Sequence, residues 1–310
     1  MATKKSSRIY FTQAVATASG DAFLAGHMQD QESEPTFTRF FKVGDAGWGH
    51  LGDLGAVAYA AVGVPVENAP RPWIAVLGRD GPLRLYKPGQ PPVDRDIPNQ
   101  DKSAWFEGMC PATDGLYVCG GQRQVLRFAN DQWQPVDQGL FVKFDGSNDC
   151  ALFAIAEASP GCLIAVGSGG LITCRAQGGA WKTLDSGTNL DLHCIVPAGD
   201  GGAWVGGDGG TLLKIAPDLG SVQDCSVSHV STRTFDSLAL HKGTLYVAAF
   251  NAVLMVQPGK ALEEVKGPFK KGSEFHAVSA AGDYVWATGD EHAYRLDSDG
   301  WKYYQCPDNI

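Results

Sequence analysis

The feature that most constrains the fold is a short pattern that recurs seven times along the chain. Each copy is a run of small or apolar residues that ends in glycine or alanine, as in the stretches that end at Gly120 and Gly167. The final residues fall at positions 26, 78, 120, 167, 207, 249 and 289. A period of roughly 40 to 50 residues is typical of folds that repeat one supersecondary unit.

Each copy divides into four predicted strands. In the fourth copy these are residues 151–157, 162–166, 171–175 and 181–184. A tryptophan marks the fourth strand in several copies: Trp48, Trp133, Trp181 and Trp301. The pattern predicts an all-β chain that forms a single seven-bladed β-propeller of four-stranded antiparallel blades. The alternatives are a pair of β-sandwiches, or a six-bladed ring with one decayed repeat.

We expect one domain over residues 1–310, because packing blades in a ring buries both faces of each sheet. The predicted blades are roughly 7–55, 56–104, 105–149, 150–190, 191–233, 234–273 and 274–310. The first and last copies each supply four strands. The sequence therefore gives no sign that a strand is exchanged between the two ends to close the ring.

Composition agrees with a folded protein rich in turns. The chain has 310 residues, of which 44% are apolar and 39 are glycine. No stretch is long and apolar enough to span a membrane, and the basic start lacks the apolar core of a signal peptide, so we expect a cytoplasmic protein. The eight cysteines form no CxxC pair, and we expect residues such as Cys119 and Cys162 to act as small buried apolar groups.

The glycine-rich turns carry a family resemblance. The stretch from Gly167 to Trp181, and residues 207–211, resemble the BNR (Asp-box) and photosystem-assembly-factor-like propellers. The resemblance is strongest over roughly 110–215. The Asp-box turn is degraded: residues 297–301 come near it, whereas residues 177–181 lack the acidic residue. The resemblance implies the fold and a structural role for the box, and it implies no activity.

The motifs of common enzymes are absent from the sequence. There is no GxSxG elbow and no Walker loop, and the arginines form no recognisable motif. We expect no enzyme activity, no cofactor and no metal. His193 and His276 fall near the channel and could face each other to bind a metal, but we favour two solvated polar residues. Residues 145–149 lack the glutamate of a calcium loop, so turn chemistry explains them better.

The charge is concentrated in two sets of predicted loops. The chain has a net charge of −9. In a propeller, the loops that join strands two and three share one face with the connections between blades. These loops hold 19 of the 34 acidic residues and 9 of the 25 basic ones. We predict that this face binds a partner; the alternative is that acidic loops only keep the fold soluble. The predicted binding residues are Asp30, Glu32, Glu34, Asp80, Asp94, Asp96, Asp101, Trp105, Phe141, Asp145, Asp149, Asp191, Asp208, Asp236, Phe250, Asp290 and Glu291.

An acidic face repels nucleic acid and attracts a basic protein. We therefore expect a monomeric, non-enzymatic binding protein that contacts neither nucleic acid nor membrane. The best hypothesis is a bacterial immunity protein that neutralises a basic toxin, such as a nuclease. One alternative is an assembly or scaffold factor that binds other proteins. Another is a lectin or cryptic hydrolase that uses the central channel.

Overall fold

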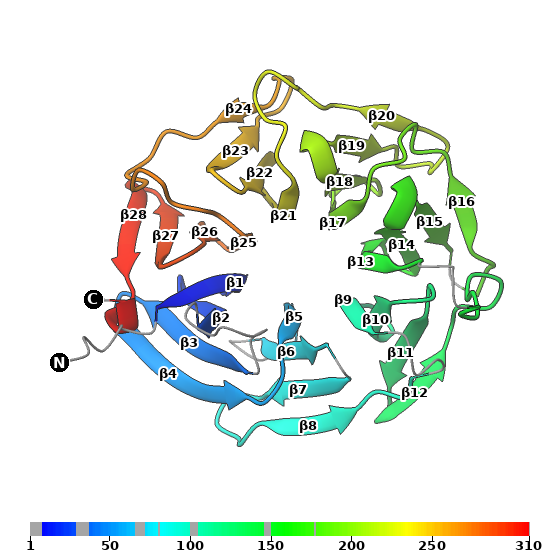
Figure 1. Cartoon of the computed structure of the whole chain (residues 1–310), viewed down its shortest axis with the longest axis horizontal. Coiled ribbons are helices and arrows are strands. Elements are labelled where there is room, and N and C mark those ends of the chain that lie inside the picture. Colours follow the sequence, from blue (N-terminus) through cyan, green and yellow to red (C-terminus); the bar gives the residue numbers. More distant parts are fainter. Residues whose placement is uncertain are drawn as a thin grey trace.

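The protein is an all-β ring of seven sheets around a central channel (Figure 1). The computed structural model describes residues 8–28, 37–65, 72–79, 81–99, 105–145, 150–176 and 178–309. Each sheet contains four antiparallel strands that follow one another in sequence, with the first strand innermost and the fourth outermost. The seven-bladed propeller predicted from the repeat is thus confirmed.

The first four sheets contain the following strands. Sheet one has β1 (Ile9–Ala16), β2 (Ala22–Met28), β3 (Thr38–Gly44) and β4 (Gly47–Leu54). Sheet two has β5 (Ala58–Val64), β6 (Trp73–Gly78), β7 (Pro82–Tyr86) and β8 (Val93–Asp96). Sheet three has β9 (Phe106–Ala112), β10 (Gly115–Gly120), β11 (Val125–Ala129) and β12 (Gln132–Pro135). Sheet four has β13 (Leu152–Ser159), β14 (Cys162–Gly167), β15 (Ile172–Arg175) and β16 (Lys182–Leu184).

The last three sheets complete the ring. Sheet five has β17 (Leu192–Pro197), β18 (Ala203–Gly207), β19 (Leu212–Ile215) and β20 (Val222–Asp224). Sheet six has β21 (Phe235–His241), β22 (Thr244–Ala249), β23 (Ala252–Val256) and β24 (Glu263–Glu264). Sheet seven has β25 (Ala277–Ala281), β26 (Tyr284–Thr288), β27 (His292–Asp297) and β28 (Gly300–Gln305). Short 3-10 turns follow β14, β18 and β28, the last at Pro307–Asn309.

The core lies between the blades. Seven apolar clusters are buried in the described residues, and each one joins two neighbouring sheets. Neighbouring residues of one strand point to opposite faces, so Leu212 packs toward the sixth sheet and Leu213 toward the fourth. Strands that are apolar on both faces are therefore required, which explains the continuous apolar runs of the repeat. The fourth-strand tryptophans pack at the edges of these clusters.

The recurring glycine has a steric cause. Gly167 and Gly207 end their strands in extended backbone, with φ of −172° and −165°. A Cβ at Gly167 would overlap the carbonyl oxygen of Ala151, and one at Gly207 would overlap that of Asp191. Because the chain that enters each blade crosses the end of the second strand here, a side chain has no room.

In the described residues, the ring closes between the first and seventh sheets without exchange of a strand, of which the sequence gives no sign. Trp286, Ala293 and Cys306 of the last sheet share one apolar cluster with residues of β1 to β3. In addition, the backbone N–H of Phe11 donates to the carbonyl of Gly289 at 3.2 Å. In the described part of the chain, no helix is long and apolar enough to cross a membrane.

Candidate binding face

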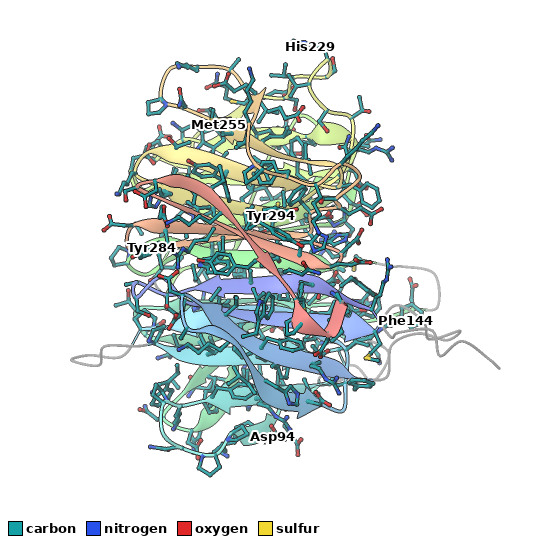
Figure 2. All side chains as sticks on the ribbon, turned by 90° about the vertical axis from the view of Figure 1, so that its left-hand side faces the viewer. Asp94, Phe144, His229, Met255, Tyr284 and Tyr294 are labelled. Atoms are coloured by element: carbon teal, nitrogen blue, oxygen red, sulfur yellow. The ribbon has the colours of Figure 1, made fainter. Side chains whose placement is uncertain are left out.

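The top face is defined as the side that carries the loops between second and third strands and the connections between blades. Backbone hydrogen bonds join the two loop sets. The N–H groups of Gly121, Ser168 and Asp208 donate to the carbonyls of Trp105, Ala151 and Asp191, at 2.7 to 3.0 Å. Phe144 lies on this side of the molecule, opposite Tyr284 on the bottom face (Figure 2). At these three blades, the loops predicted to share one face therefore do so.

The predicted binding residues fall into three groups. Trp105, Phe141, Asp145, Asp191, Asp208, Asp236, Phe250, Asp290 and Glu291 lie on the top face or at the channel mouth. Asp30, Glu32, Glu34, Asp80, Asp101 and Asp149 lie outside the described residues. The prediction is wrong for the last group, which was placed in a loop. Asp94 and Asp96 belong to β8, the outer strand of the second sheet. Both oxygens of Asp94 accept hydrogen bonds from Arg84 there, at 2.7 and 2.8 Å.

Several of the acidic residues have structural partners. Asp191 accepts a hydrogen bond from the backbone N–H of Gly169 at 2.8 Å and so fixes the turn of the preceding blade. Glu291 pairs with Arg8. Trp105 donates to Glu107, a half-buried residue of β9 at the channel whose pKa is raised by burial. These acidic residues therefore hold the loops of the face in position and also contribute to its negative charge.

His193 forms a first cluster at the channel mouth. Its Nε2 lies 3.0 Å from Oδ1 of Asp208, which also accepts a hydrogen bond from Thr234 at 2.8 Å. The imidazole ring stacks on Phe153 with ring centres 5.2 Å apart. The geometry holds His193 against Asp208, so it does not face His276 in a shared metal site as one sequence interpretation suggested.

His276 forms a second cluster with three carboxylates. It directly precedes β25, and its Nε2 lies 3.7 Å from Asp290 and 3.9 Å from Glu274. Its Nδ1 lies 3.9 Å from Asp236. Burial favours the neutral ring, but the surrounding carboxylates, Asp236 first, raise the pKa of His276. Burial and the neighbouring Asp290 raise the pKa of Glu274.

Sequence reasoning missed several residues of this face. Phe144 is 41% exposed and Leu190 is 43% exposed, so each offers an apolar contact surface. The guanidinium of Arg233 lies 5.6 Å from the ring centre of Phe250, which is itself 36% exposed. Glu274 is not among the predicted binding residues. The signal that could have identified it is its position two residues before His276, a histidine near the channel.

The first strands of all seven sheets line the central channel. The cavity measures about 500 Å³. Small and apolar side chains dominate its wall, and Glu107, His193 and Asp236 are the carboxylates and the histidine among those that line it in the described part of the chain. Each of these three is the second residue of its strand, so the carboxylates and the histidine lie near the channel mouth.

Comparison with known proteins gives a curated relative over part of the chain. No protein-family model matches the chain. The immune protein Tsi7 of Pseudomonas aeruginosa is 30% identical over 190 residues, which make up 61% of this chain and 60% of Tsi7. The chain thus matches less than two thirds of the length of that relative.

Solved structures share the propeller architecture. YCF48 from Cyanidioschyzon merolae has a TM-score of 0.66 at 10% identity, over 98% of this chain and 97% of YCF48. A structure of YCF48 bound to D1 peptide has a TM-score of 0.57 at 12% identity, over 74% and 77%. The extracellular domain of the putative hybrid two component system BT4673 from B. thetaiotaomicron has a TM-score of 0.66 at 13% identity. The match covers 97% of this chain but 38% of that one. The resemblance to photosystem-assembly-factor-like propellers is confirmed at the level of the fold.

Proposed function

We propose that this chain is a bacterial immunity protein that binds and neutralises a cognate toxin through its top face. The observation that carries the proposal is the 30% identity to the immune protein Tsi7 over 61% of the chain. A propeller presents many loops on one rigid ring, which suits the binding of a protein partner. The exposed aromatic and apolar groups Phe144, Leu190 and Phe250 supply anchors for such a contact.

The charge of the top face supports the proposal of a basic partner. On the top face, the carboxylates of Asp236, Glu274 and Asp290 surround His276 at the channel mouth. A basic surface complements such a cluster and accelerates encounter. Enzymes that act on nucleic acids carry basic surfaces, so a nuclease is the toxin class that we propose. We further propose that the protein acts in the cytoplasm, as a monomer, and without catalysis.

Capture followed by a growth assay tests this function. The purified full-length protein serves as bait in a lysate of its native host, and a stoichiometric basic partner is identified by mass spectrometry. That partner is then expressed with and without this chain. We expect it to arrest growth alone and to be harmless in the presence of the chain. Capture of a mixed set of assembly proteins without growth arrest would instead favour the scaffold alternative.

Charge variants locate the interface. Asp145→Lys and Asp208→Lys reverse charges on the top face, whereas Asp94→Lys is a matched control on the outer strand. At low salt we expect each top-face variant to slow association by about tenfold and the control to leave it unchanged. The association rate of the wild type should also fall steeply as salt is added. Equal effects of all three variants would refute the assignment to this face.

A further inference from the structure

We propose that the channel mouth holds a site for one divalent metal ion, formed by Glu274, His276 and Asp290. Each side chain offers one ligand atom, and the three atoms lie within 4.8 Å of one another. All three residues are half-buried. This inference does not depend on the proposed immunity function.

The backbone fixes the relative positions of the three residues. Glu274 and His276 flank Phe275, whose N–H donates to the carbonyl of Phe250 at 2.8 Å. The N–H of His276 donates to the carbonyl of Thr288 at 2.9 Å, two residues before Asp290. The approach of the two segments is so close that a Cβ on Gly289 would overlap the carbonyl of Glu274. The site is therefore built on strand ends and a tight backbone contact, which suits preorganised ligands.

The ligand atoms have the spacing of a coordination sphere. The 3.7 and 3.9 Å separations from the imidazole Nε2 are too long for hydrogen bonds. With metal–ligand bonds of about 2.1 Å, the donor atoms of a tetrahedral site lie about 3.4 Å apart. A small inward movement of two side chains would therefore close the three donors on one ion.

Asp236 lies where it can orient the imidazole ring of His276. Its carboxylate lies 3.9 Å from Nδ1 of His276, on the side opposite the two proposed carboxylate ligands. No hydrogen bond forms at this separation, but a small movement would let Asp236 accept from Nδ1–H. Histidine ligands commonly direct their second nitrogen to a carboxylate in that way, which leaves Nε2 free for the metal. The rings of Tyr10 and Phe250 flank the imidazole at 6.4 and 6.1 Å.

The charge of the cluster calls for a cation. Among the described residues, no lysine or arginine forms an ion pair with Asp236, Glu274 or Asp290. Lys270 and Lys271 line the cavity that Glu274 and Asp290 also line. The ammonium of Lys270 lies over the ring of Tyr303, 4.5 Å from the centre. Three carboxylates thus share a single imidazole, and their mutual repulsion would be relieved by a divalent ion.

The donor set defines the class of metal. One imidazole nitrogen and two carboxylate oxygens suit Zn²⁺ or Mn²⁺ better than Mg²⁺ or Ca²⁺, which prefer oxygen alone. Three protein ligands leave a coordination position for water.

Metal titration of the full-length protein tests the site. Zn²⁺ binding is followed by calorimetry and Mn²⁺ binding by electron paramagnetic resonance, and we expect one saturable equivalent. Glu274→Gln and His276→Gln should abolish it. Asp236→Asn should weaken it by about 10- to 100-fold, as for residues that position a ligand. His193→Gln is the matched control, because His193 has one carboxylate partner and should leave the affinity unchanged.

Three results would overturn the proposal. One is the absence of saturable binding, and another is binding that survives Glu274→Gln and His276→Gln. The third is a thiolate-to-metal absorption band with Co²⁺, which would assign the ion to cysteine. If the variants fail to fold, anomalous diffraction from wild-type crystals soaked in Zn²⁺ decides the matter. A peak between the three side chains supports the site, whereas a peak elsewhere or no peak excludes it.

Discussion

The side-chain amide of Asn309 hydrogen-bonds both backbone groups of Ile9, 300 residues earlier in the chain. Its Oδ1 accepts from the N–H of Ile9 at 2.7 Å, and its Nδ2 donates to the carbonyl at 2.8 Å. Asn309 is 9% exposed and Ile9 is 1% exposed. One side chain thus satisfies two buried backbone groups where the first sheet meets the last.

We therefore expect Asn309→Ala to destabilise the protein. Removing the amide leaves a buried N–H and a buried carbonyl without partners, at a cost of about 1–3 kcal/mol. The free energy of unfolding in urea measures it, and Asn189→Ala, at an exposed position of a blade connection, is the control. Equal stability of the two variants would mean that apolar packing alone closes the ring.

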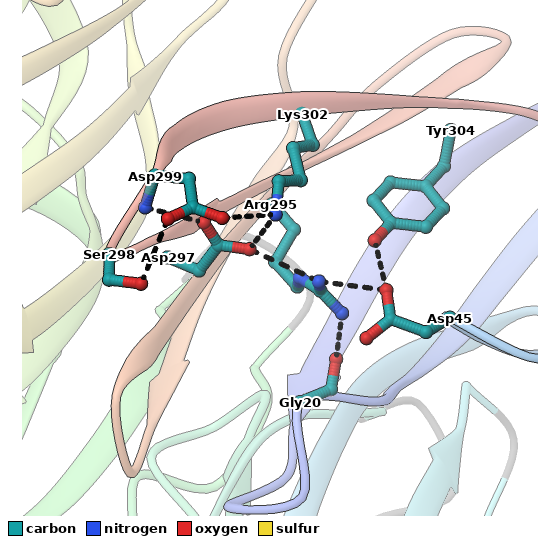
Figure 3. A network of polar contacts seen from close by, with 8 residues as sticks. All are labelled: Gly20, Asp45, Arg295, Asp297, Ser298, Asp299, Lys302 and Tyr304. Carbon is teal, nitrogen blue, oxygen red and sulfur yellow. Dashed lines mark hydrogen bonds and ion pairs between the residues drawn. The ribbon is translucent and has the colours of Figure 1, made fainter.

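Arg295 forms a second contact at the seam, the junction of the first and seventh sheets. Figure 3 shows its network of hydrogen bonds and ion pairs. The guanidinium is buried and bonds Gly20, Asp45 and Asp297 at 2.8 to 3.2 Å. We expect Arg295→Ala to cost about 3 kcal/mol, because it removes one partner from a buried ionic network and leaves a cavity. Asp45 is exposed, so Asp45→Asn should cost under about 1 kcal/mol. Thermal denaturation of both variants compares the two contributions, and a larger loss for Asp45→Asn would contradict this account.

Acid should weaken the same seam. The ion pair with Lys302, the N–H of Asp299 and Arg295 together lower the pKa of Asp297. A carboxyl whose folded pKa is depressed stabilises the protein above its unfolded value and loses that contribution as pH falls through the folded pKa. We expect the loss of stability to begin as pH approaches about 3.9, the unfolded value of an aspartate, and to continue below it. Asp297→Asn should flatten this dependence, whereas Asp218→Asn, at an exposed turn, should retain it.

The recurring glycine gives a steric prediction. A Cβ at Gly167 would meet the carbonyl oxygen of Ala151, which is backbone and moves only with its strand. Gly167→Ala should therefore cost about 1–3 kcal/mol. Gly49→Ala is the control, because no atom lies within 4 Å of the added Cβ and the residue is exposed in β4. Chemical denaturation of the pair measures the difference, and equal stability would show that the blades can separate to accept a methyl group.

The aromatic residues of the top face should contribute to partner binding. Once the partner is known, Phe250→Ala and Phe144→Ala should each lower affinity by about 1–2 kcal/mol, because truncated anchors lose buried area. Leu51→Ala is the control, since Leu51 is equally exposed but lies in the outer strand β4. Surface plasmon resonance measures the affinity of each variant for the partner. A loss of affinity confined to Leu51→Ala would show that the partner binds the outer strands and not the top face.

The sequence by itself indicated the ring, because seven similar apolar runs at intervals of 40 to 52 residues can be buried when similar units pack side by side. The repeat predicted seven four-stranded blades and the shared loop face. It also placed Asp208 and Asp290 on that face. These are properties of local pattern and period, which a chain displays without its contacts.

Only the tertiary structure decided which side chains meet. Asp94 was predicted in a loop, yet it pairs with Arg84 in an outer strand, because the length of a fourth strand is not encoded in the repeat. Asn309 meets Ile9 and Asp236 approaches His276 across separate sheets. Such contacts depend on ring closure and blade packing, which bring together residues that no local pattern relates.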